Sequence, residues 1–168
     1  MELLIVGAIL TLFFGGIVAI GAPYVPSHNS DVATAFDELY ALSKKDTIVD
    51  IGSGDGRVLR AASRRGAEAI GFELNPLLWL VSRLLSLRDR RVSVRLRDAW
   101  TTAFPDETTL VYAFSVQRDG RKLVRTVQRE ANRLERSLVL LCYGSPLKGF
   151  TPDSEKGAHY RYLIKPLK

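Results

Sequence analysis

Three acidic residues, each placed where an apolar run ends, carry the clearest chemical signal in this chain. Asp50 follows Ile48 and Val49 near the end of the run 47–51, Glu73 follows the apolar run 69–72, and Asp98 follows the alternating run 92–97. If these runs are parallel strands of one sheet, their carboxyl ends meet at one edge, where carboxylates can bind the hydroxyl and amino groups of a nucleoside. Each acid alone could be a polar strand terminator, but together they predict one nucleotide-binding crevice.

A glycine-rich segment directly after Asp50 specifies the kind of nucleotide site. Gly52, Gly54 and Gly56 alternate with other residues, and a helix-like segment follows. Glycines permit positive φ and close approach of a ligand to the backbone, and a helix start offers free N–H groups. A dinucleotide fingerprint would need glycine at Arg57, which disfavours a nicotinamide-dependent oxidoreductase. The spacing D-x-G-x-G-x-G resembles motif I of the class I S-adenosylmethionine (SAM) methyltransferases, although a plain strand-to-helix connector is the simpler alternative.

The elements that must position these residues alternate along the chain. Helix-like periodicity is found at residues 31–43, 56–65, 77–87 and 119–136, and strand-like runs at 47–51, 69–72, 92–97, 110–114, 138–142 and 159–164. This alternation predicts an α/β fold, a Rossmann-like, mostly parallel sheet with helices on both faces. In helix 77–87 we expect Leu78, Val81, Leu84 and Leu85 to point into the core.

Length and composition limit the possible classes of protein. A chain of 168 residues with net charge +6 holds one globular domain. Its single cysteine, Cys142, excludes an internal disulfide, and the two histidines, His28 and His159, lack metal-ligand spacing. We therefore predict no metal site.

The amino terminus reads as a membrane segment. Residues 3–20 contain no charged side chain, and twelve of them are Leu, Ile, Val or Phe, which is long and apolar enough to cross a bilayer. A cleaved signal peptide is the alternative, but the chain lacks a positive amino-terminal region. We predict one transmembrane anchor at 1–22, a linker and helix at 23–46, and a SAM-binding domain at 47–168. The protein is then single-pass, with its domain in the cytosol or an equivalent SAM-containing compartment.

Six arginines fall between residues 83 and 97. They could bind nucleic acid or anionic lipid, or they could be the solvated end of a helix and the exposed face of an edge strand. The predicted anchor favours lipid over nucleic acid, so we do not expect a nucleic-acid partner.

Four short segments narrow the resemblance to one family. They are Pro-Tyr-Val-Pro-Ser at 23–27, Asp-Ile-Gly-Ser-Gly-Asp-Gly-Arg at 50–57, Gly-Phe-Glu-Leu-Asn-Pro at 71–76 and Asp-Ala-Trp at 98–100. Together they resemble the membrane-anchored protein-lysine methyltransferases that, in mitochondria, modify the adenine nucleotide carrier and the c-ring protein of ATP synthase, and their prokaryotic relatives. The likeness extends from the anchor to Tyr162.

This resemblance implies SAM as the cofactor, a protein substrate with an acceptor lysine, and the membrane bilayer as a partner. It implies a SAM loop at Asp50, Gly52, Ser53, Gly54 and Asp55. Glu73 with Asn75 would lie at the ribose, Asp98 with Trp100 at the adenine, and Tyr24 over the methionine end. The family's proline-containing loop is replaced here by Phe-Ser-Val-Gln at 114–117, which leaves the acceptor open. No catalytic base is predicted.

Two other functions are consistent with the same residues. The first keeps SAM but transfers the methyl group to a lipid or a lipophilic small molecule, which an anchor would serve equally well. The second is a non-catalytic scaffold that binds an adenosine ligand.

Overall fold

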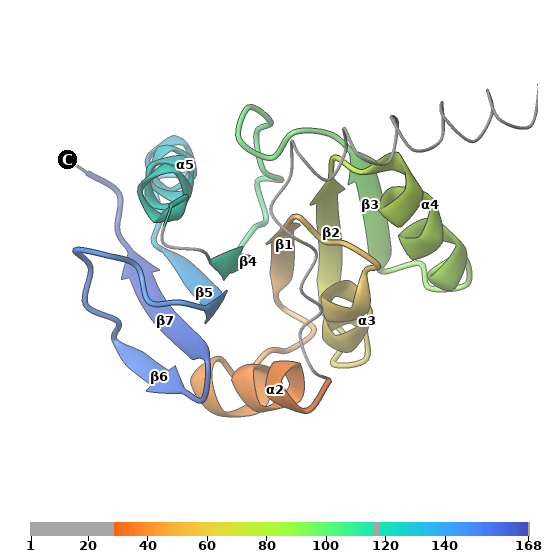
Figure 1. The fold of residues 1–168 in the computed structure, drawn as a ribbon, viewed down its shortest axis with the longest axis horizontal. Helices are drawn as coiled ribbons and strands as arrows, with labels where there is room; N and C mark the ends of the chain where they lie inside the picture. Colours follow the sequence, from red (N-terminus) through yellow and green to blue (C-terminus); the bar gives the residue numbers. More distant parts are fainter. Residues whose placement is uncertain (1–28, 116–117, 168) are drawn as a thin grey trace, which may run out of the picture.

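The computed structural model describes residues 29–115 and 118–167. Its centre is a seven-stranded sheet with the order β3-β2-β1-β4-β5-β7-β6 (Figure 1). The strands are β1 (Thr47–Ile51), β2 (Glu68–Glu73), β3 (Val92–Leu96), β4 (Leu110–Ser115), β5 (Leu138–Gly144), β6 (Ser154–Lys156) and β7 (His159–Ile164). The helices are α2 (Asn29–Thr34), the π-helical turn η1 (Ala35–Leu39), α3 (Arg57–Ser63), α4 (Pro76–Leu85) and α5 (Gly120–Arg133).

The direction and order of the strands indicate where a ligand would bind. Strands β1 to β5 pair in parallel, whereas β7 is antiparallel to both β5 and β6. The order reverses between β1 and β4, with β2 and β3 on one side of β1 and β4 and β5 on the other. In such sheets the crevice for a ligand lies at the carboxyl ends of the strands at this reversal.

Two hydrophobic cores cover the two faces of the sheet, because successive residues of a strand point to opposite faces. On one face, Val49 of β1 packs in a cluster with Leu123 and Val127 of α5. On the other, Ile48 packs in a cluster with Phe36 of η1 and Leu59 of α3. The expected mostly parallel α/β sheet with helices on both faces is therefore confirmed.

The orientation of α4 differs from the prediction. Leu84 and Leu85 are 56% and 58% exposed, not buried, and the only fully buried residue of the helix is Ser82. A Cβ added to Gly56 would come within 2.1 Å of the Ser82 hydroxyl oxygen, so the close approach of the two segments requires small residues at both positions. The helix also lies at one end of the sheet, where it contacts mainly the edge strand β3 (Figure 1).

Two other segments differ from the sequence-based expectation. The helix expected at 31–43 ends earlier, because Tyr40 is extended and its hydroxyl donates a 2.6 Å hydrogen bond to Asp46. The short strand β6 was not expected, since Ser154–Lys156 is polar; it forms because Gly157, at φ 56°, turns the chain back onto β7.

The predicted anchor at 1–22 lies outside the described residues. Among residues 29–115 and 118–167, no helix has the length and apolar character needed to span a bilayer.

Candidate functional site

The glycine-rich loop leaves β1 in a backbone conformation that only glycine adopts easily. Gly52, Gly54 and Gly56 have φ values of 74°, 55° and 77°. A Cβ added to Gly52 would meet no atom within 4 Å, so this residue borders open space. The Gly52 and Ser53 N–H groups both donate to the Phe72 carbonyl of β2. The loop is therefore fixed to β2 through the Gly52 and Ser53 N–H groups, while the Cα atom of Gly52 faces open space that a ligand could occupy.

The Glu73 carboxylate fixes the other side of this loop. Glu73 is buried at the end of β2 and accepts three backbone hydrogen bonds. Gly54 N–H donates to Oε2 at 2.7 Å, while Leu74 and Asn75 N–H donate to Oε1 at 2.9 and 2.8 Å. The Asn75 side chain then caps α4 by accepting from Leu77 and Leu78 N–H. One carboxylate thus connects the glycine loop to the start of the next helix.

Asp50 is buried at the centre of this arrangement. Burial raises its pKa well above the ordinary value, and the nearby carboxylates of Glu73 and Asp55 raise it further. Asp55 behaves differently: burial opposes its ionisation, but hydrogen bonds from Arg57 outweigh that effect and lower its pKa. A group of acids so close together favours a cationic ligand, which would relieve their mutual repulsion.

Asp98 and Trp100 follow β3 at the same edge. Leu96, the last residue of β3, pairs in register with Glu73, and Arg97 N–H donates to the Glu73 carbonyl. The Asp98 carboxylate accepts the Trp100 N–H at 2.9 Å. The Lys122 ammonium lies 4.5 Å from the centroid of the Trp100 ring. The three predicted strand-end acids therefore lie on neighbouring strands at one edge of the sheet.

Comparison with known proteins identifies the family of this domain. The family model described as the ANTKMT methyltransferase domain matches residues 50–154, more than half of the chain. The chain belongs to this methyltransferase family.

Two relatives and one solved structure show the extent of the similarity. The chain is 30% identical over 138 residues to the human lysine N-methyltransferase of the ATP synthase c-subunit, covering 80% of this chain and 57% of that protein. It is 35% identical over 88 residues to the mouse adenine nucleotide translocase lysine N-methyltransferase, covering 50% and 38%. It thus matches only about half the length of these relatives. The crystal structure of a Salinibacter ruber RNA methyltransferase with S-adenosyl-L-homocysteine shares the fold, with TM-score 0.75, 24% identity and coverage of 84% and 94%.

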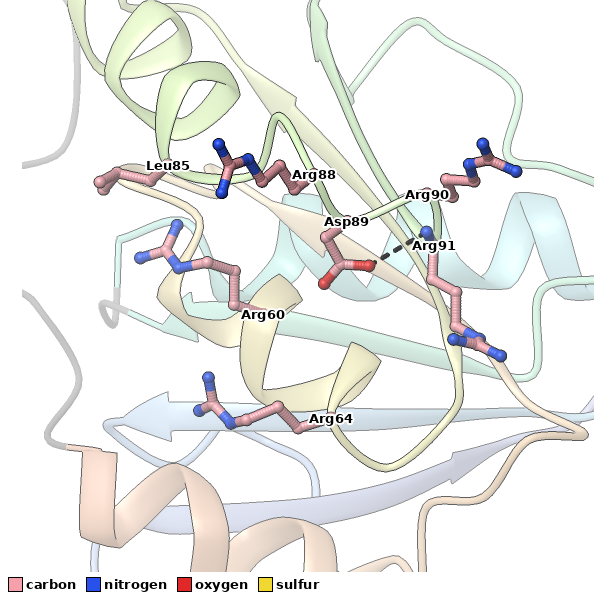
Figure 2. Close-up of a pocket in the computed structure, with 7 residues that line it drawn as sticks. All are labelled: Arg60, Arg64, Leu85, Arg88, Asp89, Arg90 and Arg91. Atoms are coloured by element: carbon pink, nitrogen blue, oxygen red, sulfur yellow. Dashed lines mark hydrogen bonds between the residues drawn. The ribbon is translucent and has the colours of Figure 1, made fainter.

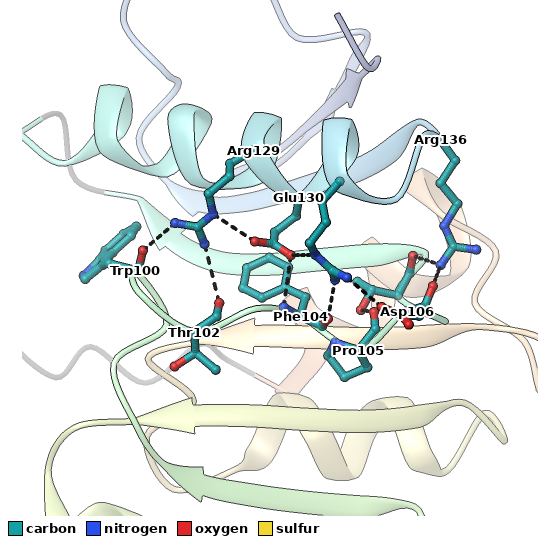
Figure 3. A network of polar contacts seen from close by, with 10 residues as sticks. Trp100, Thr102, Phe104, Pro105, Asp106, Arg129, Glu130 and Arg136 are labelled. Atoms are coloured by element: carbon teal, nitrogen blue, oxygen red, sulfur yellow. Dashed lines mark hydrogen bonds and ion pairs between the residues drawn. The ribbon is translucent and has the colours of Figure 1, made fainter.

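The methyltransferase domain contains a buried polar network that the sequence did not lead us to expect (Figure 3). Glu130 of α5 is 1% exposed and accepts hydrogen bonds from Phe104 N–H at 3.1 Å, Arg129 Nε at 2.9 Å and Arg133 Nε at 2.8 Å. Arg129 also donates to the Trp100 carbonyl at 2.7 Å. Arg136 donates to the Asp106 and Thr108 carbonyls. This network holds the loop 97–109, which carries Asp98 and Trp100, against α5.

One sequence signal could have pointed to Glu130. Counted from Leu123 at helical spacing, Glu130 falls on the same face as the buried Val127 and Ala131. A carboxylate on the apolar face of a helix must find a partner. Arg129 and Arg133, close to it on the same helix, supply two.

Aromatic side chains gather next to Asp50 on the side of β4. Tyr112 pairs in register with Asp50, and its hydroxyl lies 2.8 Å from Nε2 of the buried His159. The Tyr143 ring is 4.7 Å from the His159 ring and 6.1 Å from that of Phe114. The Tyr143 hydroxyl donates to Asp31 at 3.3 Å. We call Tyr112, Phe114, Tyr143 and His159 the aromatic cluster.

His159 of the aromatic cluster is uncharged at neutral pH. Burial lowers the pKa of His159 to about 4, although the nearby Asp31 opposes this shift. His159 is distant in sequence from Tyr112 and reaches it only because β7 pairs with β5.

The predicted site residues fall into three groups. Asp50, Gly52, Ser53, Gly54, Asp55, Glu73 and Asn75 lie together at the ends of β1 and β2, and Asp98 and Trp100 follow the adjacent β3. Tyr24 lies outside the described residues. Ser53 is buried and packs close to Gly71, where a Cβ would be 2.5 Å from the Ser53 hydroxyl oxygen, so its role in this arrangement is to pack the loop against β2.

Proposed function

We propose that this chain is a SAM-dependent methyltransferase that methylates a lysine side chain of a membrane-associated protein. The observation that carries the proposal is the position of Asp50, Glu73 and Asp98 at the ends of three neighbouring strands, on the sheet edge that carries the glycine loop, in a chain of the ANTKMT methyltransferase domain family. The names of the human and mouse relatives support a protein lysine as the acceptor.

The residues of the crevice fit SAM by charge and by shape. SAM carries a sulfonium and an ammonium group, and Asp50 lies in a group of acids that a cation would stabilise. The open space at Gly52 admits a ligand close to the loop backbone. We assign Glu73 to the ribose and Asp98 with Trp100 to the adenine. When bound, SAM supplies an electrophilic methyl group on its sulfonium.

The aromatic cluster is our candidate for the acceptor site. A lysine must lose its proton before it can attack, and at pH 7 this costs about 4.6 kcal/mol for a free pKa of about 10.4. Aromatic faces attract an ammonium group, and a site that excludes water lowers the amine pKa. Phe114 and Tyr143, in register two residues beyond the pair of Asp50 and Tyr112, supply such faces, and Tyr112 contacts the neutral His159. We assign no general base.

We also propose that residues 1–22 anchor the protein in a membrane as a single-pass segment. The support is the uncharged, apolar run at 3–20. An anchor would keep the domain close to a substrate that is itself in the bilayer.

The function is tested with the full chain in detergent or vesicles. We expect S-adenosylhomocysteine to bind in a calorimetric titration and NAD not to bind. Incubation with methyl-labelled SAM and a membrane preparation should then label protein, and mass spectrometry should locate the label on lysine. Label found only in the organic extract would instead establish a lipid or small-molecule acceptor. A folded protein that does not bind S-adenosylhomocysteine would refute the proposal.

Replacing Asp50 by asparagine should raise stability and weaken cofactor binding together. Because the pKa of Asp50 is higher in the fold than in the unfolded chain, its ionisation destabilises the fold; this cost is absent below the ordinary pKa of 3.8 and complete above the raised value. We expect the melting temperature of Asp50→Asn to be higher than that of the wild type at neutral pH. At pH 3.8 or below, the two melting temperatures should be the same. SAM should bind about tenfold more weakly or worse, since a charge-assisted hydrogen bond is lost. Thermal unfolding across pH with calorimetry measures both effects, and a lower melting temperature at neutral pH would contradict this account.

A further inference from the structure

Exposed leucines are concentrated at one end of the molecule. Seven of the ten large hydrophobic side chains found exposed in the described part of the chain lie on α4, beside its ends or on the edge strand β3: Leu74, Leu77, Leu80, Leu84, Leu85, Leu87 and Leu96, each at least 46% exposed. Isolated exposed leucines are normal, whereas a contiguous group of this kind marks a surface that contacts a partner.

A basic pocket adjoins these leucines. A cavity of about 570 Å³ lies between α3 and the turn after α4, lined by five arginines, Asp89 and Leu85. Figure 2 shows the guanidinium groups of Arg60 and Arg88 near Leu85 and that of Arg64 farther away, beyond Arg60, with Arg90 and Arg91 on the other side of Asp89. Leu85 lines the pocket and is itself 58% exposed, so the pocket meets the exposed leucines at the carboxyl end of α4.

The acidic residue in the pocket does not neutralise it. The Asp89 carboxylate accepts hydrogen bonds from the Ser63 hydroxyl at 2.8 Å and from Arg91 N–H at 3.1 Å, which commits it to holding the turn against α3. Arg64 and Arg88 lie beside it and reach solvent. Several guanidinium groups around one cavity form a site for a phosphate group, because arginine binds phosphate oxygens through paired N–H donors.

We propose that α4 and the turn 86–91 form a surface that lies on a bilayer containing anionic phospholipid. The leucines enter the boundary between headgroups and acyl chains, and the arginine pocket binds a lipid phosphate. This pairing of apolar and basic side chains is typical of segments that lie in a membrane interface. Bound RNA would satisfy the arginines but leave the leucines in water, so the surface matches a bilayer better.

This surface would also orient the methyltransferase domain. Helix α4 starts directly after Glu73 and Asn75, so contact with the bilayer would hold that end of the crevice near the membrane. The inference rests on the exposed side chains and the pocket, and it does not depend on methyl transfer or on the predicted anchor.

The surface is tested by placing an environment-sensitive fluorophore on α4 of the full chain. The single native cysteine, Cys142, is 0% exposed, so Leu84→Cys can be labelled selectively. The matched control is Leu163→Cys on β7, a position that is 40% exposed and lies near the other end of the sheet. In vesicles of phosphatidylcholine and phosphatidylglycerol, we expect a lipid-borne quencher to quench the label at 84 and to leave the label at 163 unaffected.

Substituting arginines of the pocket should weaken the contact between α4 and the bilayer. Each arginine near an anionic surface contributes roughly a factor of five, so Arg64→Gln with Arg88→Gln should weaken the contact of α4 about 25-fold. Binding of S-adenosylhomocysteine, measured on the same samples, should be unchanged, which separates this inference from the proposed function. An unquenched label at position 84 would overturn it. A response of that label to RNA but not to anionic vesicles would overturn it in favour of a nucleic-acid surface.

Discussion

Replacing Glu73 by alanine is expected to weaken binding of S-adenosylhomocysteine at least about 100-fold. Under the proposed assignment of Glu73 to the ribose, the variant loses a charged acceptor for the ribose hydroxyls, and each hydrogen bond to a charged group contributes about 1.5–3 kcal/mol. It also loses the carboxylate that holds Gly54, Leu74 and Asn75 N–H, so the loop and the start of α4 are no longer fixed before the ligand arrives. Calorimetric titration of the full chain measures the change.

Two further variants make the Glu73 prediction specific. Glu73→Gln keeps the size of the side chain, but both carboxylate oxygens accept from backbone N–H groups. Either orientation of the amide therefore places an NH₂ group against a donor, and we expect most of the loss to remain. Glu68→Ala, at the exposed start of the same strand, is the matched control and should bind normally. Wild-type affinity in Glu73→Ala would remove Glu73 from the cofactor site.

Replacing Glu130 by alanine is expected to lower the free energy of unfolding by about 2–4 kcal/mol. The variant leaves the buried Phe104 N–H without its partner and a cavity beneath the loop 97–109. Loss of the carboxylate costs Arg129 and Arg133 less, because their side chains are 46% and 37% exposed and can form hydrogen bonds with water instead. Urea unfolding followed by circular dichroism gives the difference. Glu107→Ala, an exposed acid in the same loop, is the control and should change stability by less than about 0.5 kcal/mol.

The effect of Glu130 should depend on pH. Burial disfavours its ionisation, but hydrogen bonds from Arg133, Phe104 N–H and Arg129 outweigh burial and lower its pKa below the ordinary 4.5. A carboxylate with a depressed pKa stabilises the fold above its ordinary pKa, and this contribution is lost as the pH falls through the depressed value. The stability difference between wild type and Glu130→Ala should therefore shrink below pH 4.5. A constant difference down to about pH 3 would mean that cavity formation, and not charge, accounts for the loss.

The sequence predicted the position of the strand-end acids and the glycine loop better than that of the aromatic cluster, for a physical reason. A parallel strand brings its carboxyl end to a common edge whatever its neighbours are, so Asp50, Glu73 and Asp98 could be grouped from strand endings alone. The glycines could be interpreted similarly, because positive φ at Gly52, Gly54 and Gly56 is a local backbone requirement. The family resemblance rested on these local segments, and the family match confirms it.

Tertiary structure alone decided the remaining features. All residues of α4 except Ser82 and Arg83 are apolar, so periodicity did not select its buried face; the close approach of Gly56 to Ser82 selects it and leaves the leucines exposed. Glu130 contacts the loop 97–109, which lies far away in sequence, and His159 reaches Tyr112 only because β7 enters the sheet beside β5. These features depend on which segments pack together, and that pairing is fixed by the burial of side chains from the whole chain, which no single segment encodes.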